Sequence, residues 1–258
     1  MNISKSINEI MALCSSKPIN NIKNIIEAQA KLDFKSRREV RRSSQIASNI
    51  FNVPFQDSML QDYYYWDNTT LSLILPLREY VRNKNSVLEI GPGPAATLSR
   101  YLQKTYEGLH IVCAEVDPQF AISARKAVLV SGGGIEVNVS DMTSNIENKF
   151  DIVFMNPPYV SNVDLFKLDI NAGTPEFQAG SGGSDGLEVV EKFLTEVPVV
   201  LKSHGAALLG INNLYFPDAE VIRLINKSNL SLIRKFYCID SVPPFSQVYV
   251  LSKKEGST

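Results

Sequence analysis

The chain has 258 residues, of which 44% are hydrophobic and 21% are charged, so it can form one large core or a core plus a small second domain. This composition excludes a mainly disordered protein. Its 26 Lys and Arg residues against 27 Asp and Glu residues leave a net charge of -1, so the whole chain lacks the positive field that drives non-specific nucleic-acid binding. The segment 35–42 (KSRREVRR) nevertheless carries five basic side chains and one acidic side chain, a local charge of +4.

The N-terminal region has apolar residues at helical spacing from about residue 3 to 50, which predicts two or three short helices. This pattern breaks at Pro54 and an aromatic segment, QDYYYWDN, follows. A further helix is predicted to start near Asn68, where Thr69 and Thr70 fit helix capping better than a border of a ligand site. We therefore expect a helical domain at 1–66 and a larger domain at 67–258. The aromatic run 63–66 fits either packing between the domains or stacking on a ligand.

After residue 83, short apolar strands alternate with amphipathic helices, which is typical of a parallel sheet covered on both faces. The fold class predicted is therefore α/β, with a doubly wound, mostly parallel seven-stranded sheet and a small helical N-terminal domain. The turn SVPPF between the last two strands is too short for a parallel return, so these two should be antiparallel. Strands are expected at 86–90, 109–115, 135–139, 151–155, 206–211, 231–239 and 246–252, and helices near 95–105, 118–130, 186–202 and 217–228.

The sequence lacks a signal peptide or membrane-spanning pattern and also lacks paired cysteine motifs. No signal-peptide core is visible near the N-terminus, and the apolar stretch 71–77 is far shorter than the ~20 residues of a membrane-spanning helix. The three cysteines are widely spaced and lack a CxxC pattern, so we expect no disulfide framework and no metal site. A cytoplasmic protein without membrane contact is the prediction; the oligomeric state stays open.

A glycine loop connects the first strand to the next helix in the segment VLEIGPGPAATLSRYL, the place where a backbone approaches a ligand closely. Gly91 and Gly93 are its glycines, and the flanking prolines remove two N–H donors that a pyrophosphate would use. Glu115 ends the second strand and could accept ribose hydroxyls, and Asp141 closes the third strand.

The tetrapeptide Asn156-Pro157-Pro158-Tyr159 directly follows the fourth strand, at the sheet edge where open α/β folds bind ligands. An amide or exocyclic aromatic nitrogen is a poor nucleophile because its lone pair is delocalised. If the Asn156 side-chain oxygen and the Pro157 carbonyl accept its two N–H groups, the lone pair turns toward an electrophilic methyl group. Tyr159 can stack on the planar group being methylated. Asn156, Pro157 and Tyr159 are therefore the candidate catalytic residues.

These motifs together resemble the class I S-adenosylmethionine-dependent methyltransferases over residues 83–252. The resemblance implies S-adenosylmethionine as cofactor and S-adenosylhomocysteine as product. It also implies roles for Glu89, Gly91 and Gly93 by the methionine moiety, for Glu115 at the ribose and for Asp141 at the adenine. Asn156 would border the same cofactor.

The segment GGSDGLEVVEKFL after NPPY is similar to the HemK-type methyltransferases, which methylate a glutamine of peptide-chain release factors. This resemblance implies protein methylation of a translation factor, gripped by the N-terminal domain. YYYWDNTTLSLIL stands where that family has an Arg-Pro motif, and DSVPPFSQVYVL replaces its usual ending, so the reaction type is better indicated than the substrate. Two alternatives stay open: methylation of an adenine amino group in RNA or DNA, with segment 35–42 contacting phosphates, and methylation of a small molecule or peptide.

Overall fold

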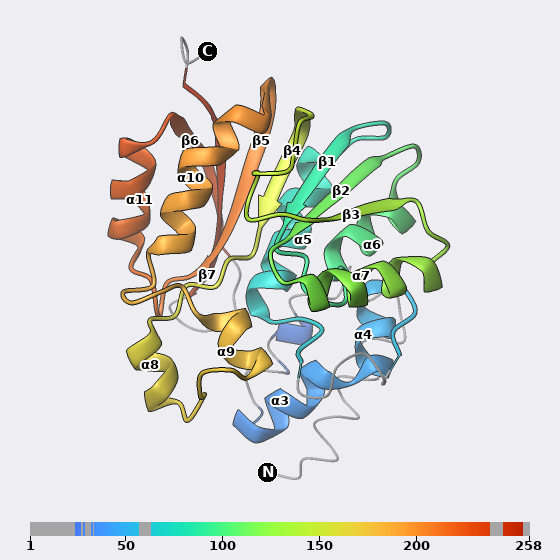
Figure 1. Cartoon of the computed structure of the whole chain (residues 1–258), viewed down its shortest axis with the longest axis vertical. Helices are drawn as coiled ribbons and strands as arrows, with labels where there is room; N and C mark the ends of the chain where they lie inside the picture. The colour runs from blue at the N-terminus through green and yellow to red at the C-terminus, as the bar shows by residue number, and fades with distance from the viewer. Residues whose placement is uncertain are drawn as a thin grey trace.

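The structure, a computed structural model, describes residues 24–26, 28, 32, 34–56, 63–237 and 245–254. Its centre is a seven-stranded sheet with the order β3-β2-β1-β4-β5-β7-β6 (Figure 1). The first five strands run parallel, and β7 pairs antiparallel with both β5 and β6. The strands are β1 (Ser86–Ile90), β2 (His110–Glu115), β3 (Ile135–Val139), β4 (Phe150–Met155), β5 (Leu201–Asn212), β6 (Leu230–Tyr237) and β7 (Ser246–Lys253).

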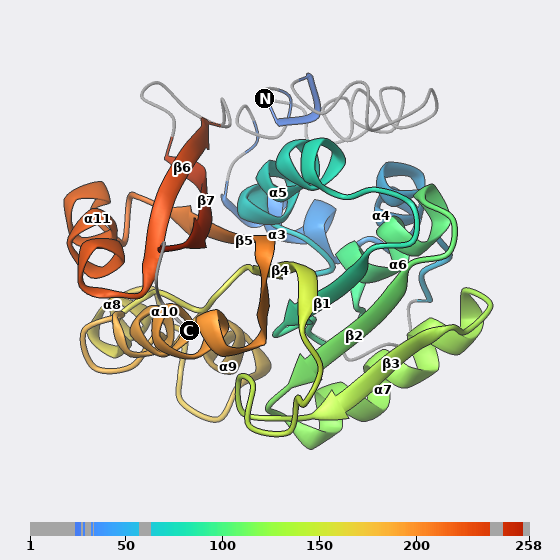
Figure 2. The same ribbon diagram turned by 90° about the horizontal axis from the view of Figure 1, so that it is seen from above.

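Helices cover both faces of this sheet, so its central strands are apolar on both sides. Val87 of β1 joins the core under α5 (Asn68–Tyr80), α6 (Thr97–Thr105) and α7 (Pro118–Val130). Leu88, the next residue, joins the second core under α10 (Glu188–Val200) and α11 (Asp218–Lys227). Figure 2 shows the sheet between α5 on one side and α10 and α11 on the other. The α/β fold class predicted from the sequence is confirmed.

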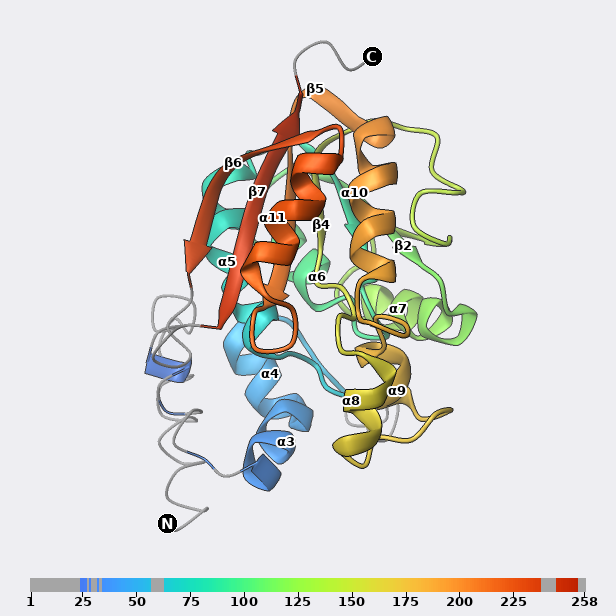
Figure 3. The same ribbon diagram turned by 90° about the vertical axis from the view of Figure 1, so that its left-hand side faces the viewer.

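Four short helices gather beyond the carboxyl ends of the parallel strands: α3 (Phe34–Arg42), α4 (Ser44–Phe51), α8 (Asn162–Lys167) and α9 (Pro175–Gly180) (Figures 1 and 3). Ile46, Ile50 and Phe51 of α4 are buried in the same apolar cluster as the α5 side of the sheet. The N-terminal helices therefore share a core with the sheet, and they lie at the edge where the sequence places its candidate site.

The predicted elements agree with the structure except at two places. β5 begins at Leu201, directly after α10, and includes the exposed residues 202–204, whereas the expected helix ended at 202 and the expected strand began at 206. A register shift between β4 and β5 accommodates them. The stretch after Tyr159, expected to be a loop, contains α8 and α9. Their caps, Ser161 and Thr174, explain why such short helices form.

Other expectations concern residues outside the described part. The helices expected before residue 24 lie outside the described residues, so the 1–66 and 67–258 division stays a prediction. Within the described ranges, no helix combines the length and apolar character needed to cross a bilayer.

Candidate active site

The two glycines in the loop after β1 both donate their N–H groups to other atoms of the protein. Gly91 and Gly93 have φ values of +66° and +63°, the left-handed region that glycine adopts without strain. The Gly91 N–H donates to the Ala114 carbonyl at 2.8 Å, and the Gly93 N–H donates to Glu115 Oε2 at 3.0 Å. Neither N–H is left for a pyrophosphate, which agrees with the sequence-based argument against a dinucleotide.

Glu115 is a buried carboxylate held in place by the backbone. Its side chain is 4% exposed, and Oε1 accepts a second hydrogen bond from the Asp117 N–H at 3.0 Å. Burial raises the pKa of Glu115, and the N–H groups of Asp117 and Gly93 oppose that rise. Each oxygen accepts one bond and keeps a further lone pair, so Glu115 can still accept hydroxyl donors.

Glu89 lies one strand away and faces α6. Its Oε2 accepts hydrogen bonds from the N–H of Ser99 at 3.1 Å and from the Ser99 hydroxyl. Burial raises the pKa of Glu89 to about 7. The nearby charge of Glu115 also raises this pKa, whereas the two hydrogen bonds from Ser99 lower it. Its charge state therefore changes near neutral pH.

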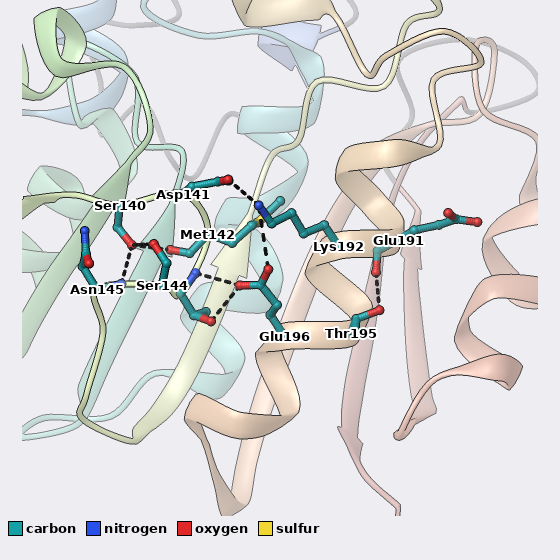
Figure 4. A network of polar contacts seen from close by, with 10 residues as sticks. Ser140, Asp141, Met142, Ser144, Asn145, Glu191, Lys192, Thr195 and Glu196 are labelled. Carbon is teal, nitrogen blue, oxygen red and sulfur yellow. Dashed lines mark hydrogen bonds and ion pairs between the residues drawn. The ribbon is translucent and has the colours of Figure 1, made fainter.

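Asp141, the third predicted cofactor residue, has a different environment. It follows β3 by two residues, its side chain is 60% exposed, and it forms an ion pair with Lys192 of α10. Figure 4 shows this pair beside Glu196, which accepts hydrogen bonds from the N–H and hydroxyl of Thr143. Asp141 thus stands at the same sheet edge as Glu115 but on the surface.

The side-chain nitrogen of Asn156 donates two hydrogen bonds, whereas its side-chain oxygen accepts none. Its Nδ2 donates to Asp67 Oδ1 at 3.2 Å and to Thr70 Oγ1 at 3.3 Å, at the start of α5. Its Oδ1 is buried and has no hydrogen-bond partner. A buried acceptor without a donor costs about 1–3 kcal/mol, and a donor on a bound molecule would remove that cost.

Tyr159 is fixed at its hydroxyl end. The residue is 8% exposed, and its OH lies 3.0 Å from the Thr69 hydroxyl. Burial raises the pKa of the Tyr159 hydroxyl well above its usual value, and Asp67 adds to this effect, so the phenol stays protonated. Pro157, between Asn156 and Tyr159, is also buried.

The GGSDGL segment packs directly on the backbone of Tyr159. A Cβ atom on Gly182 would lie 2.8 Å from Tyr159 Cα, and one on Gly186, where φ is +82°, would lie 2.6 Å from the Tyr159 carbonyl oxygen. Hydrogen bonds between Val160 and both Gly180 and Gly182 join the two segments. The glycines therefore allow this loop to support NPPY at van der Waals distance.

The residues of the aromatic run 63–66 differ in position: some are buried in the apolar core, and one lies against the glycine loop. Tyr65 and Trp66 are buried in the apolar cluster. Tyr63 lies against the glycine loop, because a Cβ on Gly93 would meet its hydroxyl oxygen at 2.3 Å, and its ring packs edge-on against Phe120 at 5.4 Å. Tyr63 therefore lines the candidate cofactor site.

The basic segment of α3 is engaged by protein groups. Arg38 and Arg42 both form ion pairs with Glu176 of α9, and the Tyr64 hydroxyl accepts from Arg38 at 2.7 Å. Arg41 donates to Asn68 Oδ1 at 3.2 Å, and burial lowers its pKa while Asp67 raises it. This arrangement links α3 to the segment that follows NPPY.

Sequence reasoning did not assign a site role to Asp67 and treated Thr69 and Thr70 as helix caps. The capping role of Thr70 is confirmed, since it forms a capping box with Asp67. The spacing D-x-x-T before an apolar run signals a helix start. Their contact with Asn156 and Tyr159 comes from the fold, which joins positions about ninety residues apart. Among the described residues, no group of three His, Cys, Asp or Glu side chains could hold a metal ion.

Residues 64–172 match the family described as Methyltransferase small domain. This segment includes β1, the glycine loop, Glu115, Asp141 and NPPY. The match confirms the predicted resemblance to methyltransferases over this part of the chain.

Several named relatives align with the same region. A Methanocaldococcus jannaschii protein described as a candidate N5-glutamine methyltransferase is 32% identical over 51% of this chain and 64% of its own length. A release factor glutamine methyltransferase of Deinococcus radiodurans is 26% identical over 54% of this chain and 50% of its own. A ribosomal RNA small subunit methyltransferase C of Actinobacillus pleuropneumoniae is 26% identical over 54% of this chain and 40% of its own. The chain thus covers roughly half the length of these relatives.

Solved structures share the fold at low sequence identity. A methyltransferase from Pyrococcus furiosus superposes with a TM-score of 0.57 at 19% identity, covering 84% of this chain and 97% of that chain. A Thermus thermophilus 16S rRNA methyltransferase in complex with AdoMet and guanosine gives a TM-score of 0.50 at 16% identity, covering 78% of this chain and 45% of that chain. The fold of the sheet domain is therefore that of methyltransferases.

Proposed function

We propose that this chain transfers the methyl group of S-adenosylmethionine to a planar nitrogen, and that the nitrogen is a glutamine side-chain amide in a protein. The observation that carries the proposal is the Asn156 side chain, whose buried Oδ1 has no donor while its Nδ2 is held by Asp67 and Thr70. A substrate N–H group would satisfy that oxygen. The substrate must therefore present a hydrogen-bond donor on the atom that reacts.

The residues around the glycine loop fit S-adenosylmethionine. Glu115 keeps free lone pairs for two ribose hydroxyls. Glu89, whose pKa burial raises to about 7, would ionise beside a ligand that carries a sulfonium and an ammonium group, because a nearby cation favours the charged form of a carboxyl. Gly91 and Gly93 would lie by the methionine part, and Asp141 would border the adenine from the exposed edge of the site. When bound, this cofactor supplies an electrophilic methyl group on sulfur.

The chain's own residues would orient the acceptor nitrogen. Asn156 Oδ1 accepts one N–H of the substrate, and the Pro157 carbonyl, which follows in the chain, accepts the other. Both hydrogen bonds bias the nitrogen lone pair away from the planar group and toward the methyl. Tyr159, fixed through Thr69, offers a ring face against the planar group. Orientation and hydrogen bonding replace a strong base, and the nitrogen, which is cationic once methylated, releases one proton to water while S-adenosylhomocysteine leaves.

A protein glutamine is favoured over an adenine by three observations. GGSDGL packs on the Tyr159 backbone in the way that the resemblance to glutamine methyltransferases leads us to expect. The Methanocaldococcus jannaschii relative named as an N5-glutamine methyltransferase is 32% identical, against 26% for the ribosomal RNA methyltransferase quoted above. Arg38 and Arg42 are paired with Glu176, so much of segment 35–42 is directed at the protein itself rather than at a polyanion.

Asn156→Ala tests the catalytic role. Removing the acceptor oxygen should lower the rate of methyl transfer by about 100- to 1,000-fold, as loss of one oriented polar group commonly does, and leave S-adenosylmethionine affinity within about threefold. Tritium-labelled S-adenosylmethionine measures the rate and calorimetry measures the affinity. Methyl transfer at the wild-type rate in Asn156→Ala would contradict the proposal.

The same label identifies the acceptor in a lysate. Label removed by protease and retained after nuclease supports the protein substrate. Label removed by nuclease supports the second candidate, an RNA amino-group methyltransferase, which the similarity to a protein named as a ribosomal RNA methyltransferase favours. Label resistant to both treatments in a small soluble fraction indicates a small-molecule acceptor.

A further inference from the structure

We propose that Asp67 and Thr70 are positioning residues that determine which way the Asn156 amide faces. This inference rests on the proposed function, because it explains how the acceptor oxygen of Asn156 is kept pointing toward a substrate. It adds two residues that lie outside NPPY and the cofactor motifs, both at the N-terminus of α5, and it gives the capping box of that helix a second role.

Every hydrogen in the capping box has a defined place. Asp67 Oδ1 accepts from the Thr70 N–H at 2.6 Å and from the Thr70 hydroxyl at 2.8 Å. Because the Thr70 hydroxyl donates its only hydrogen to the carboxylate, its oxygen can act only as an acceptor toward other groups. The Asp67 N–H uses one lone pair of that oxygen at 3.2 Å. The remaining lone pair faces Asn156.

Asn156 therefore meets two acceptors and no donor on this side. Its Nδ2 lies 3.2 Å from Asp67 Oδ1 and 3.3 Å from Thr70 Oγ1. Rotating the amide by half a turn would bring Oδ1 against the Asp67 carboxylate oxygen, which carries no hydrogen. Oδ1 could gain a donor there only if the Thr70 hydroxyl gave up its hydrogen bond to Asp67. That orientation is repulsive, so the amide keeps its nitrogen toward α5 and its oxygen toward the buried position without a partner.

The same helical turn also fixes Tyr159. Thr69, between Asn68 and Thr70, contacts the Tyr159 hydroxyl at 3.0 Å, and its side chain is 1% exposed. The first turn of α5 thus holds Asn156 and Tyr159, the first and last residues of NPPY. A set of contacts at both ends of the tetrapeptide is expected of a device that orients it, since helix capping alone requires neither contact.

The rate test compares two substitutions of one residue. Thr70→Val keeps the shape and removes the hydroxyl, whereas Thr70→Ser keeps the hydroxyl. We expect Thr70→Val to lower kcat at least about tenfold with KM for S-adenosylmethionine within about threefold, and Thr70→Ser to restore most of the rate. Asp67→Asn, which retains a capping side chain and removes the charge, should also lower kcat. The labelled-methyl assay is used with the acceptor identified for the wild type.

A matched control separates this effect from loss of a cap. Ser43 caps α4 through its hydroxyl, which accepts from the Ile46 N–H at 3.3 Å, and among the described residues none of its hydrogen bonds reaches NPPY. Ser43→Ala should lower thermal stability while leaving kcat unchanged. Wild-type kcat in folded Thr70→Val and Asp67→Asn would overturn the proposal, as would a rate loss in Ser43→Ala equal to that in Thr70→Val.

A second measurement does not depend on activity. In a nitrogen-15 NMR spectrum of the wild type, the Asn156 side-chain amide is assigned as the signal that disappears in Asn156→Ala. Its two hydrogens should exchange with solvent at least about tenfold faster in Thr70→Val than in the wild type or Thr70→Ser. Equal exchange in all three would overturn the positioning role. If the wild type methylates no acceptor, the proposed function fails, and this exchange measurement still decides the inference.

Discussion

Glu115 and Asp141 are acids at the ends of neighbouring parallel strands, and the sequence gives no reason to rank them. In the structure, Glu115 is 4% exposed and accepts backbone N–H groups at both oxygens. Asp141 is 60% exposed and pairs with Lys192, a contact of the kind that salt screens and solvent weakens. The difference shows that the loops after a strand decide whether its terminal acid is buried and held by backbone N–H groups or left at the surface.

Between the two strand ends, the largest expected effect is the loss of cofactor affinity on substitution of Glu115. Glu115→Ala removes an acceptor that is already oriented, and hydrogen bonds to a charged group contribute about 1.5–3 kcal/mol, so the Kd for S-adenosylmethionine should rise about 10- to 100-fold. Calorimetry measures this directly. Glu115→Gln, which keeps one acceptor oxygen, should lie between the wild type and Glu115→Ala. An unchanged Kd in Glu115→Ala would remove Glu115 from the ribose site.

A second effect concerns Glu89 and the pH dependence of stability. Burial raises its pKa from 4.5 to about 7. Between these values the unfolded chain releases the proton and the folded chain keeps it, so the unfolding free energy falls as pH rises, by about 3 kcal/mol, and levels off above pH 7. Glu89→Gln should lose this part of the dependence. Urea unfolding from pH 4.5 to 8 measures it.

Parallel stability curves for the wild type and Glu89→Gln over that pH range would show that Glu89 is ionised in the folded protein throughout. Burial also raises the pKa of Glu115, so some decline with pH should persist in Glu89→Gln. A smaller decline of the unfolding free energy with pH in Glu89→Gln would show that the measurement detects the remaining buried acid, Glu115.

The smallest effect is expected at Asp141. Asp141→Ala should change the Kd for S-adenosylmethionine by less than about threefold and the unfolding free energy by about 0.5 kcal/mol or less, because the side chain is exposed and its ion pair is at the surface. Lys192→Met, which removes the ion-pair partner of Asp141 instead, is the matched variant and should have a similarly small effect. An affinity loss in Asp141→Ala as large as that in Glu115→Ala would break the comparison between the two strand ends.

The sheet was predictable from the sequence because its signals are local. Alternating strands and helices after residue 83 predict the parallel order, and the short SVPPF turn predicts the antiparallel end, which is confirmed. The helices α8 and α9 were missed because each has only six residues, too few for an apolar period to appear. Their capping residues, Ser161 and Thr174, were the available signal.

The motifs of the candidate site were predictable from the sequence, but the contacts that hold those motifs in place were not. Glycine loops and NPPY are read from neighbouring residues, whereas the contact of Asn156 with Asp67 joins distant positions of the chain. The same holds for the packing of Gly186 on Tyr159. The basic segment 35–42 shows the converse: its charge is visible in the sequence, but Glu176, which engages Arg38 and Arg42, lies more than 130 residues away.

The paired contacts of Arg38 and Arg42 with Glu176 also matter for protein engineering. A chimera that exchanges α3 with that of a related enzyme would leave Glu176 facing foreign side chains and would strand a carboxylate that is 13% exposed. Grafts of the N-terminal helices onto another catalytic sheet should therefore be cut so that α8 and α9 travel with them as one exchangeable module.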